Sequence, residues 1–327
     1  MVVVRLVVSL AAGCDSSTGP HRSGVDAGAG SPAARARCRD RAGANGLLQS
    51  APHSAPGVTR FSVMLVDRSR STPAIPHRAA MPCRLLPTEV RYPTGATSPL
   101  PLVVVAHGLD GNPSSLATLL DAWAGAGYVV AAPAFPTTSK DSNGVSLASE
   151  SVDQAADMSF VIGQMLERSR PQAAGPLRGL IDGRRIGAAG MSLGGLSVYG
   201  LVTNTCCRDA RVRAAILMAA VRRQFPEEQY ENNKVPVLIV QGDADTGYHN
   251  SLEAYPELVP PKWFITLHGS GHSSPFEVPP GPEAPLVYRT TAWFWDRYLK
   301  HDQSASRRIT DAVRASHGRA TLRRDLG

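Results

Sequence analysis

Short apolar runs that alternate with helical patterns constrain the fold of this chain more than any other feature of its sequence. Leu102–Ala106 has the sequence LVVVA and Val235–Val240 has the sequence VPVLIV, so neither run has a polar face. Strands of this kind are buried on both sides, as in a parallel sheet covered by helices. Because helical patterns separate the strands, we expect an α/β fold with a mostly parallel, doubly wound sheet of about eight strands flanked by helices.

The expected elements follow from apolar periodicity and from the turn residues between the apolar runs. Strands are predicted at Phe61–Val66, Leu86–Tyr92, Leu102–Ala106, Tyr128–Ala132, Arg185–Gly190, Val212–Val221, Val235–Gln241 and Trp263–Leu267. Helices are predicted from a cap at Ser114 or Ser115 to Gly127, and at Asp153–Arg168, Leu193–Thr205 and Leu286–Lys300. The arginines that follow His301 are expected on a solvated basic helix.

A Gly-x-Ser-x-Gly motif occurs at Gly190–Gly194, between a predicted strand and a predicted helix. This context is typical of a nucleophile elbow, in which a serine on a sharp, strained turn projects its hydroxyl above the sheet. Side chains two residues before and after the serine would collide in such a turn, so both positions require glycine. Ser192 is therefore the candidate nucleophile. The alternative is a Gly-rich turn in which Ser192 only caps the helix.

A hydroxyl nucleophile needs a base, and the base needs an orienting acid, in the chain order Ser, acid, His. For the acid, Asp245 is preferred to Asp243, because it lies further out on the loop after a strand; Asp243 would bind backbone amides in the turn. For the base, His272 is preferred because it lies on a Gly-rich loop that can fold back. His268 is expected to point into the sheet face, and His249 to lie on the surface.

Two backbone N–H groups are expected to form an oxyanion hole. One belongs to Leu193, the residue after the candidate nucleophile. The other is expected from Leu109, in the loop after the first central strand, where Gly108 allows close approach of the backbone. His107 is expected to hydrogen-bond nearby backbone at the strand end.

Composition limits the partners of the chain. Hydrophobic residues make up 43% of the sequence, enough for one large core, and charged residues make up only 19%. The formal net charge is +7, but no basic run is interleaved with aromatic residues, so no nucleic-acid partner is expected. Neither a CxxC nor an HExxH motif is present, so we expect no metal site. No cofactor is expected either, because a triad of this kind supplies nucleophile, base and oxyanion stabilisation without one.

The cysteines leave several pairings open. Apart from Cys14, the chain has Cys38, Cys83, Cys206 and Cys207, which allow three pairings. A bridge between the two adjacent cysteines would be strained, and a pair with a distant cysteine would form more easily. Buried free thiols are the alternative.

The first 59 residues differ in composition from the rest of the chain. Residues 1–14 are predicted to be an export signal, and Leu10–Cys14 resembles a bacterial lipoprotein signal, which makes Cys14 a candidate lipid anchor. An ordinary secretion signal or a mis-assigned start codon is the alternative. Residues 15–59 are predicted to be a flexible linker before a single catalytic domain at 60–327. We therefore expect a secreted or cell-surface lipoprotein of a bacterium.

Five stretches carry a resemblance to a known superfamily. They are LVVVAHGLDGNP at Leu102–Pro113, GYVVAAPAF at Gly127–Phe135, RIGAAGMSLGG at Arg185–Gly195, VPVLIVQGDADT at Val235–Thr246 and TLHGSGHSSPF at Thr266–Phe276. The chain resembles the α/β-hydrolase superfamily, and within it the bacterial dienelactone-hydrolase-like, platelet-activating-factor-acetylhydrolase-like and cutinase-type polyester esterases. This resemblance implies the α/β-hydrolase fold and an esterase triad of Ser192, Asp245 and His272.

Three positions depart from the patterns of these families. Dienelactone hydrolases proper use a cysteine where this chain has Ser192, so their substrate is not implied. Met191 stands where many members carry His or Tyr. Leu109 stands where cutinase-type polyester esterases tend to carry an aromatic residue, which weakens the case for aromatic polyesters.

The site is expected to be open. Many lipases and epoxide hydrolases of this fold insert a cap where only Arg222–Lys234 separates two predicted strands of this chain. No large cap domain is therefore expected, and an open, shallow site suits bulky or polymeric esters. The predicted substrate-binding residues are Phe135, Met191, Tyr248 and Phe276. The alternative for each of them is a place in the core.

These features predict a monomeric serine hydrolase that cleaves carboxylic esters through an acyl-enzyme on Ser192, as an esterase, lipase or cutinase-like enzyme. Two alternatives keep the same triad, namely an amidase and an acyltransferase. A third alternative is a non-catalytic surface lipoprotein on a hydrolase scaffold.

Overall fold

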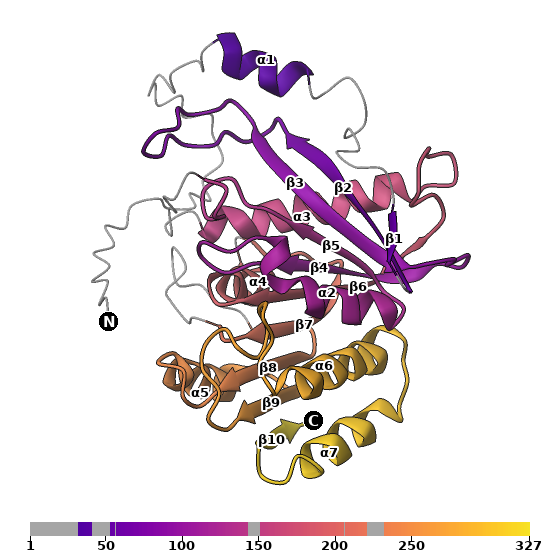
Figure 1. Ribbon diagram of the computed structural model, residues 1–327, viewed down its shortest axis with the longest axis vertical. Helices are drawn as coiled ribbons and strands as arrows, with labels where there is room; N and C mark the ends of the chain where they lie inside the picture. Colours follow the sequence, from indigo (N-terminus) through magenta and orange to yellow (C-terminus); the bar gives the residue numbers. More distant parts are fainter. Residues whose placement is uncertain (1–31, 41–52, 56, 143–150, 206, 221–231) are drawn as a thin grey trace.

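The computed structural model describes residues 32–40, 53–55, 57–142, 151–205, 207–220 and 232–327. Ten strands within these residues form one sheet (Figure 1). The strands are β1 (His53–Ala55), β2 (Val58–Asp67), β3 (Arg84–Pro93), β4 (Leu100–Ala106), β5 (Val129–Pro133), β6 (Ile181–Met191), β7 (Val212–Met218), β8 (Val237–Gly242), β9 (Lys262–Leu267) and β10 (Ala320–Asp325). The helices are α1 (Pro32–Asp40), the 3-10 helix η1 (Pro113–Leu116), α2 (Ala117–Gly125), α3 (Ser151–Arg168), α4 (Leu193–Thr203), α5 (Tyr248–Glu257), α6 (Ala284–Leu299) and α7 (Ala305–Arg314).

The strand order is β1-β2-β3-β5-β4-β6-β7-β8-β9-β10. Neighbouring strands from β5 to β9 run parallel, whereas β1, β2 and β3 lead into β5, and β9 into β10, through antiparallel pairs. The predicted mostly parallel sheet is confirmed, and the eight predicted strands correspond to β2–β9. The two additional strands extend the sheet at its edges.

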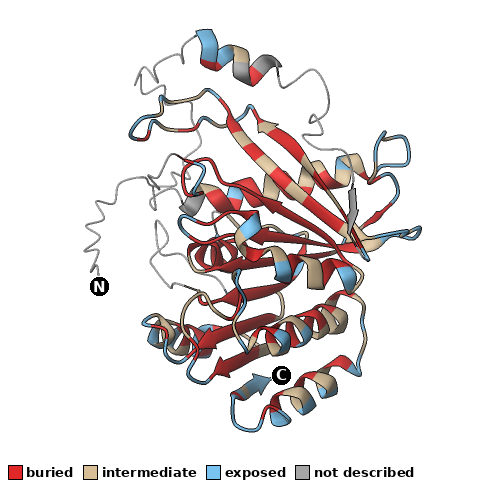
Figure 2. Cartoon of the chain, in the orientation of Figure 1, coloured by how far each residue is buried: buried red, intermediate tan, exposed pale blue. Residues whose placement is uncertain are grey.

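Side chains of the central strands alternate between two hydrophobic clusters, one on each face of the sheet. Figure 2 shows these central strands coloured as buried along most of their length. In β4, Leu102 and Val104 belong to the cluster that contains residues of α3, α4 and α5. Val103 and Val105 belong to the cluster that contains residues of α2, α6 and α7. Because helices cover both faces, the run LVVVA needs no polar side.

The first helix after β4 begins differently from the prediction. Its cap is Asn112, whose Oδ1 accepts the backbone N–H groups of Ser114 and Ser115. The predicted cap at Ser114 or Ser115 is wrong, because Pro113 opens a short 3-10 turn before α2. Asn112 itself lies in extended conformation, as an N-cap residue should.

The segment after His301 is more than a solvated basic helix. Helix α7 buries Ala305, Ile309 and Val313, and the last arginines lie on β10, which pairs with β9. The guanidinium of Arg323 lies 4.9 Å from the ring centroid of Tyr255. These contacts tie the C-terminal segment to the body of the domain, and charged residues on an outer strand oppose edge-to-edge pairing with another chain.

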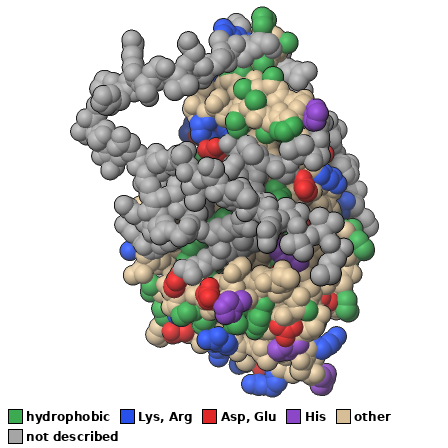
Figure 3. Space-filling view, turned by 90° about the vertical axis from the view of Figure 1, so that its left-hand side faces the viewer, with side chains coloured by type: hydrophobic (Ala, Val, Ile, Leu, Met, Phe, Trp, Pro, Cys, Tyr) green, Lys and Arg blue, Asp and Glu red, His purple; other side chains and the backbone are tan. Residues whose placement is uncertain are grey.

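Charged side chains of both signs share the face of the molecule that Figure 3 shows. On the described surface of the face in Figure 3, Lys, Arg, Asp and Glu side chains are interspersed. Of the helices in the described residues, none combines the length and the hydrophobicity needed to cross a bilayer.

The predicted linker at residues 15–59 is wrong in part. It contains α1 and β1, and β2 begins at Val58. Cys38 of α1 forms a disulfide with Cys83, just before β3. This bridge occupies Cys38 and Cys83, so neither of them is the distant partner that we expected for Cys206 or Cys207. Cys207 is also disulfide-bonded, while Cys206, Cys14 and the predicted export signal lie outside the described residues.

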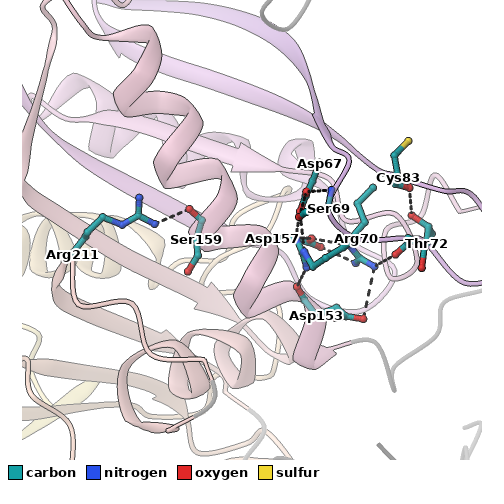
Figure 4. A network of polar contacts seen from close by, with 11 residues as sticks. Asp67, Ser69, Arg70, Thr72, Cys83, Asp153, Asp157, Ser159 and Arg211 are labelled. Carbon is teal, nitrogen blue, oxygen red and sulfur yellow. Dashed lines mark hydrogen bonds and ion pairs between the residues drawn. The ribbon is translucent and has the colours of Figure 1, made fainter. Parts of the chain in front are cut away.

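A buried network of charges joins the start of β3 to α3, close to this disulfide (Figure 4). Arg84 Nε donates to Asp157 Oδ1 over 2.7 Å, and Arg84 Nη2 donates to Asp157 Oδ2 over 2.8 Å. Both side chains are completely buried. Arg70 reaches Asp157 over 2.6 Å and is itself held by Asp67. The network fixes the outer antiparallel strands against the helix that covers them.

Candidate active site

Ser192 occupies a strained turn between β6 and α4. Its backbone has φ 54° and ψ −117°, a positive φ that residues with a side chain rarely adopt. A Cβ atom on Gly190 would lie 2.1 Å from the carbonyl oxygen of Gly194, and one on Gly194 would lie 2.4 Å from that of Ala106. Both glycines are therefore required by close backbone contacts. The Ser192 side chain makes no capping hydrogen bond to α4, which excludes the alternative of a mere helix cap.

Asp245 and His272 form a hydrogen-bonded pair. His272 Nδ1 lies 2.7 Å from Asp245 Oδ2. The Asp245 side chain is 2% exposed, whereas that of His272 is 40% exposed. Because the carboxylate can only accept, Nδ1 carries the proton and Nε2 is the basic nitrogen of the ring.

Three predicted residues lie at one edge of the sheet. Ser192 follows β6, Asp245 follows β8 and His272 follows β9, and these strands run parallel within the same sheet. The carboxyl ends of parallel strands meet at a common edge, which is where open α/β sheets place their sites. The topology thus places Ser192 at the same edge of the sheet as the hydrogen-bonded pair of Asp245 and His272, although Ser192 and His272 are 80 positions apart in the chain.

The other candidates for the acid and the base, Asp243, His268 and His249, make contacts of their own. His268 is exposed and lies 2.6 Å from Asp243, and Asp243 also accepts the N–H of Gly269. Asp243 therefore binds backbone as predicted, and the hydrogen bond from His268 lowers its pKa. The prediction that His268 points into the sheet face is wrong, because β9 ends at Leu267 and the next residue turns outward. His249 lies on the surface and pairs with Glu253.

Gln241 is a site residue that sequence analysis missed. Its Nε2 donates to Asp245 Oδ2 over 2.6 Å, and its Oε1 accepts the hydroxyl of Ser251 over 2.9 Å. Asp245 Oδ1 accepts the N–H of Gly247 as well. The signal was a polar amide at the end of an otherwise apolar strand, which must find partners when it is buried. These contacts fix the carboxylate that orients His272.

His107 joins the ends of β4 and β5. Its Nδ1 donates to the carbonyl oxygen of Gly108 over 2.7 Å, and its Nε2 accepts the N–H of Phe135 over 3.1 Å. The predicted structural role is confirmed. Burial lowers the pKa of His107 from its ordinary value of 6.5 to about 4. Both ring nitrogens are used by backbone groups, so the ring is neutral at physiological pH.

The depressed pKa of His107 makes folding stability depend on pH. Between about 6.5 and about 4, the unfolded chain binds a proton that the folded chain does not bind. The free energy of unfolding is therefore expected to fall as pH falls through this window, with roughly 3 kcal/mol contributed by His107. Urea unfolding at pH 7, 6, 5 and 4 should show a flatter pH dependence for His107→Gln than for the wild type. Equal slopes for His107→Gln and the wild type would contradict the prediction.

The loop after β4 lies against Ser192. A Cβ atom on Gly108 would be 3.2 Å from the Cβ of Ser192, which is tighter than most such contacts, so the glycine eases the close approach of this loop. The loop is held by backbone bonds from Asp110 N–H to Thr138 and from Lys140 N–H to Gly111. Leu109 is 42% exposed, beside these anchored residues. The Leu109 and Leu193 backbones therefore flank the candidate nucleophile.

The buried side-chain amide of Gln154, which the sequence did not reveal, connects two segments next to this loop. Gln154 of α3 donates through Nε2 to Thr138 Oγ1 and accepts the Ser197 hydroxyl at Oε1 over 2.9 Å. Ser197 belongs to α4, the helix that Ser192 precedes. Thr138 lies in the segment after β5 and accepts the N–H of Asp110, so Gln154 links the segment that holds the loop after β4 to the helix that follows Ser192.

The four predicted substrate-binding residues are mostly core residues. Phe135 and Phe276 are completely buried and Met191 is 2% exposed, so none of these three offers an exposed side chain, and their role in substrate binding stays a prediction. Tyr248 is half-buried, with its hydroxyl 3.2 Å from Thr266 Oγ1. The alternative interpretation, burial in the core, holds because large apolar side chains next to strand ends pack under the helices. The segment Arg222–Lys234, which we predicted to be too short for a cap domain, lies largely outside the described residues.

The sheet order, the strained serine turn and the Asp–His pair at the same edge define an α/β hydrolase. Residues 87–322, more than half of the chain, match the PET hydrolase-like family, and the chain belongs to this family. Membership supports, at the level of the family, a serine ester hydrolase of the polyester type. No curated protein matches the chain. Among the described residues, no group of three or more His, Cys, Asp or Glu side chains could hold a metal ion.

Proposed function

We propose that this protein cleaves carboxylic esters, polyester chains among them, through an acyl-enzyme on Ser192. The observation that carries the proposal is the strained turn of Ser192, because a backbone at φ 54° persists only where the surrounding structure imposes it. The family membership supports an ester as the substrate.

The reaction that this arrangement supports begins with attack of Ser192 Oγ on the ester carbonyl carbon. His272 Nε2 takes the hydroxyl proton, and later gives it to the oxygen of the leaving alcohol. Asp245 holds Nδ1–H and stabilises the imidazolium that forms. Water then attacks the acyl-enzyme with His272 again acting as base, which releases the acid and restores Ser192.

The developing alkoxide is assigned to the backbone N–H groups of Leu109 and Leu193. Leu193 is the first residue of α4, so its N–H lies at a helix N-terminus, where the helix dipole favours negative charge. The anchored loop at Asp110 and Gly111 supports the Leu109 position, since a donor aimed in advance stabilises the transition state without reorganisation.

An open site is proposed for bulky or polymeric esters. Support comes from the exposure of Leu109, an apolar side chain next to Gly108 and Ser192. The disulfide between Cys38 and Cys83 supports export, because disulfides persist in oxidising compartments. We therefore propose a secreted or lipid-anchored monomer, with Cys14 as the candidate anchor.

Hydrolysis of p-nitrophenyl esters from acetate to palmitate, together with release of soluble products from a polyester film, tests the proposal. We expect ester turnover and covalent labelling by a fluorophosphonate, with the labelled peptide containing Ser192. The chain-length profile separates an esterase from a lipase.

The same experiment distinguishes the alternatives. Transfer of the acyl group to an added alcohol, with little free acid, would favour an acyltransferase, and turnover of p-nitroanilides in preference to esters would favour an amidase. A folded protein that neither turns over any ester nor takes up the fluorophosphonate would contradict the proposal and favour a binding role at the cell surface.

A further inference from the structure

The loop that carries His272 is held on both sides by one carboxylate, that of Glu283. Ser270 Oγ donates to Glu283 Oε1 over 2.5 Å, and Ser274 Oγ donates to the same oxygen over 2.6 Å. The two serines stand two residues before and two residues after His272. A single oxygen therefore closes a short loop whose middle residue is the histidine.

Glu283 is itself held on a rigid element. It is the N-cap residue of α6, and its carbonyl oxygen accepts the N–H groups of Leu286 and Val287. The helix behind it is anchored in the core through Val287 and other buried residues. A carboxylate at a helix N-terminus is also favoured by the helix dipole.

The Glu283 carboxylate is charged at neutral pH. Burial raises its pKa, but the hydroxyls of Ser270 and Ser274 outweigh that effect and leave the pKa below its ordinary value. Hydrogen bonds to an ionised acceptor are shorter and stronger than neutral ones. The two short contacts from the serines agree with this.

Backbone hydrogen bonds anchor the loop at Ser270 and at Ser274, on either side of the three residues centred on His272. The carbonyl oxygen of Ser270 accepts the N–H of Ala244, and that of Ser274 accepts the N–H of Gly281. Gly242 permits the first contact, because a Cβ there would lie 2.2 Å from the Ser270 oxygen. The Glu283 carboxylate joins the two anchored ends to each other.

We propose that Glu283 is a positioning residue, which sets the placement of the His272 imidazole by holding the Ser270 and Ser274 hydroxyls together. The proposal rests on the proposed function, because Glu283 acts on the reaction through His272. Its loss should lower kcat, since a displacement of a catalytic group by 1 Å costs about 100-fold. KM should change little, because the substrate does not bind to Glu283.

Two substitutions of similar size separate the hydrogen-bond acceptor from the charge. Glu283→Met removes the acceptor and is expected to lower kcat for p-nitrophenyl butyrate by about 100-fold, with KM within about twofold. Glu283→Gln keeps an oxygen that can accept both hydroxyls and is expected to recover most of kcat. Glu277→Met, on the same loop, is the matched control and should keep wild-type kinetics, because Glu277 contacts Ser273 through its backbone.

A spectroscopic measurement tests the positioning role of Glu283 without relying on catalytic turnover. The low-field proton resonance of His272 Nδ1–H, produced by its bond to Asp245, should persist in Glu283→Gln and broaden or vanish in Glu283→Met. If the wild type hydrolyses no ester, the proposed function fails while this resonance still tests the positioning role. If Glu283→Met does not fold, the double variant Ser270→Ala/Ser274→Ala removes the two donors instead.

Three results would overturn the inference. The first is a folded Glu283→Met, or a folded double serine variant, with kcat within threefold of the wild type. The second is a Glu283→Gln variant that loses as much kcat as Glu283→Met, which would assign the effect to the charge. The third is an unchanged His272 resonance in every variant.

Discussion

Replacing Ser192 by alanine is expected to lower kcat for p-nitrophenyl ester hydrolysis on the order of 10⁶-fold, as removal of the serine from such a triad does. In the proposed mechanism the Ser192 hydroxyl forms the acyl-enzyme, so no neighbouring group can replace it. The fold should be retained, because alanine occupies the same φ of 54° with no larger side chain. Initial rates with a purified enzyme and an active-site titration of the wild type measure the effect.

The matched control is Ser306→Ala on α7, which should keep the wild-type rate. Ser192→Gly adds a second check, because glycine relieves the strain of a positive φ. That variant should be as inactive as Ser192→Ala and should unfold at a higher urea concentration. Residual turnover within 100-fold of the wild type in both Ser192 variants would show that another group is the nucleophile.

Replacing Asp157 by asparagine is expected to lower the free energy of unfolding by about 3–5 kcal/mol. The change leaves the Arg84 guanidinium buried opposite a neutral amide, and neither side chain has access to water. The charge of Arg70 loses one of its two carboxylate partners as well. Urea unfolding with the Cys38–Cys83 disulfide intact measures the loss.

A double variant separates the cost of a buried charge that has lost its bidentate partner from the value of the pair; the Asp153 carboxylate, 3.8 Å from Arg84, is present in both variants. In Arg84→Met/Asp157→Leu both charges are removed, and most of the lost stability should return, because the pair is costly to desolvate. The control is Arg170→Gln, which breaks an exposed pair with Glu167 and should change stability by less than about 1 kcal/mol. A single Asp157→Asn variant within 1 kcal/mol of the wild type would show that solvent or a neighbour compensates the charge.

Local patterns in the sequence were sufficient for the central sheet and for the candidate catalytic residues. A strand that is covered on both faces appears in the sequence as a continuous run of apolar residues, as at Leu102–Ala106. The Gly-x-Ser-x-Gly turn has a steric requirement that shows directly as two glycines, Gly190 and Gly194. Motifs that follow strand ends, as Asp245 and His272 do, meet wherever the strands are parallel.

The substrate-binding residues could not be found in the same way. Whether an aromatic side chain beside a strand end enters a pocket or the core depends on which helix packs over it. Phe135 and Phe276 are completely buried, although both stand close to loops of the site. Hydrophobicity alone does not distinguish the two environments, since both favour the same residue types.

The sequence by itself determined the order of the strands β2–β9, the glycines of the serine turn, and the candidate acid and base that follow the later strands, because each depends on residues that are near one another in the chain. Only the tertiary structure decided which polar groups support them. Gln241, Gln154 and Glu283 are ordinary polar residues in the sequence, and their partners Ser251, Ser197 and Ser270 are 10, 43 and 13 residues away. A hydrogen bond requires two groups within about 3 Å of each other. That proximity arises when the chain packs, and no local pattern encodes it.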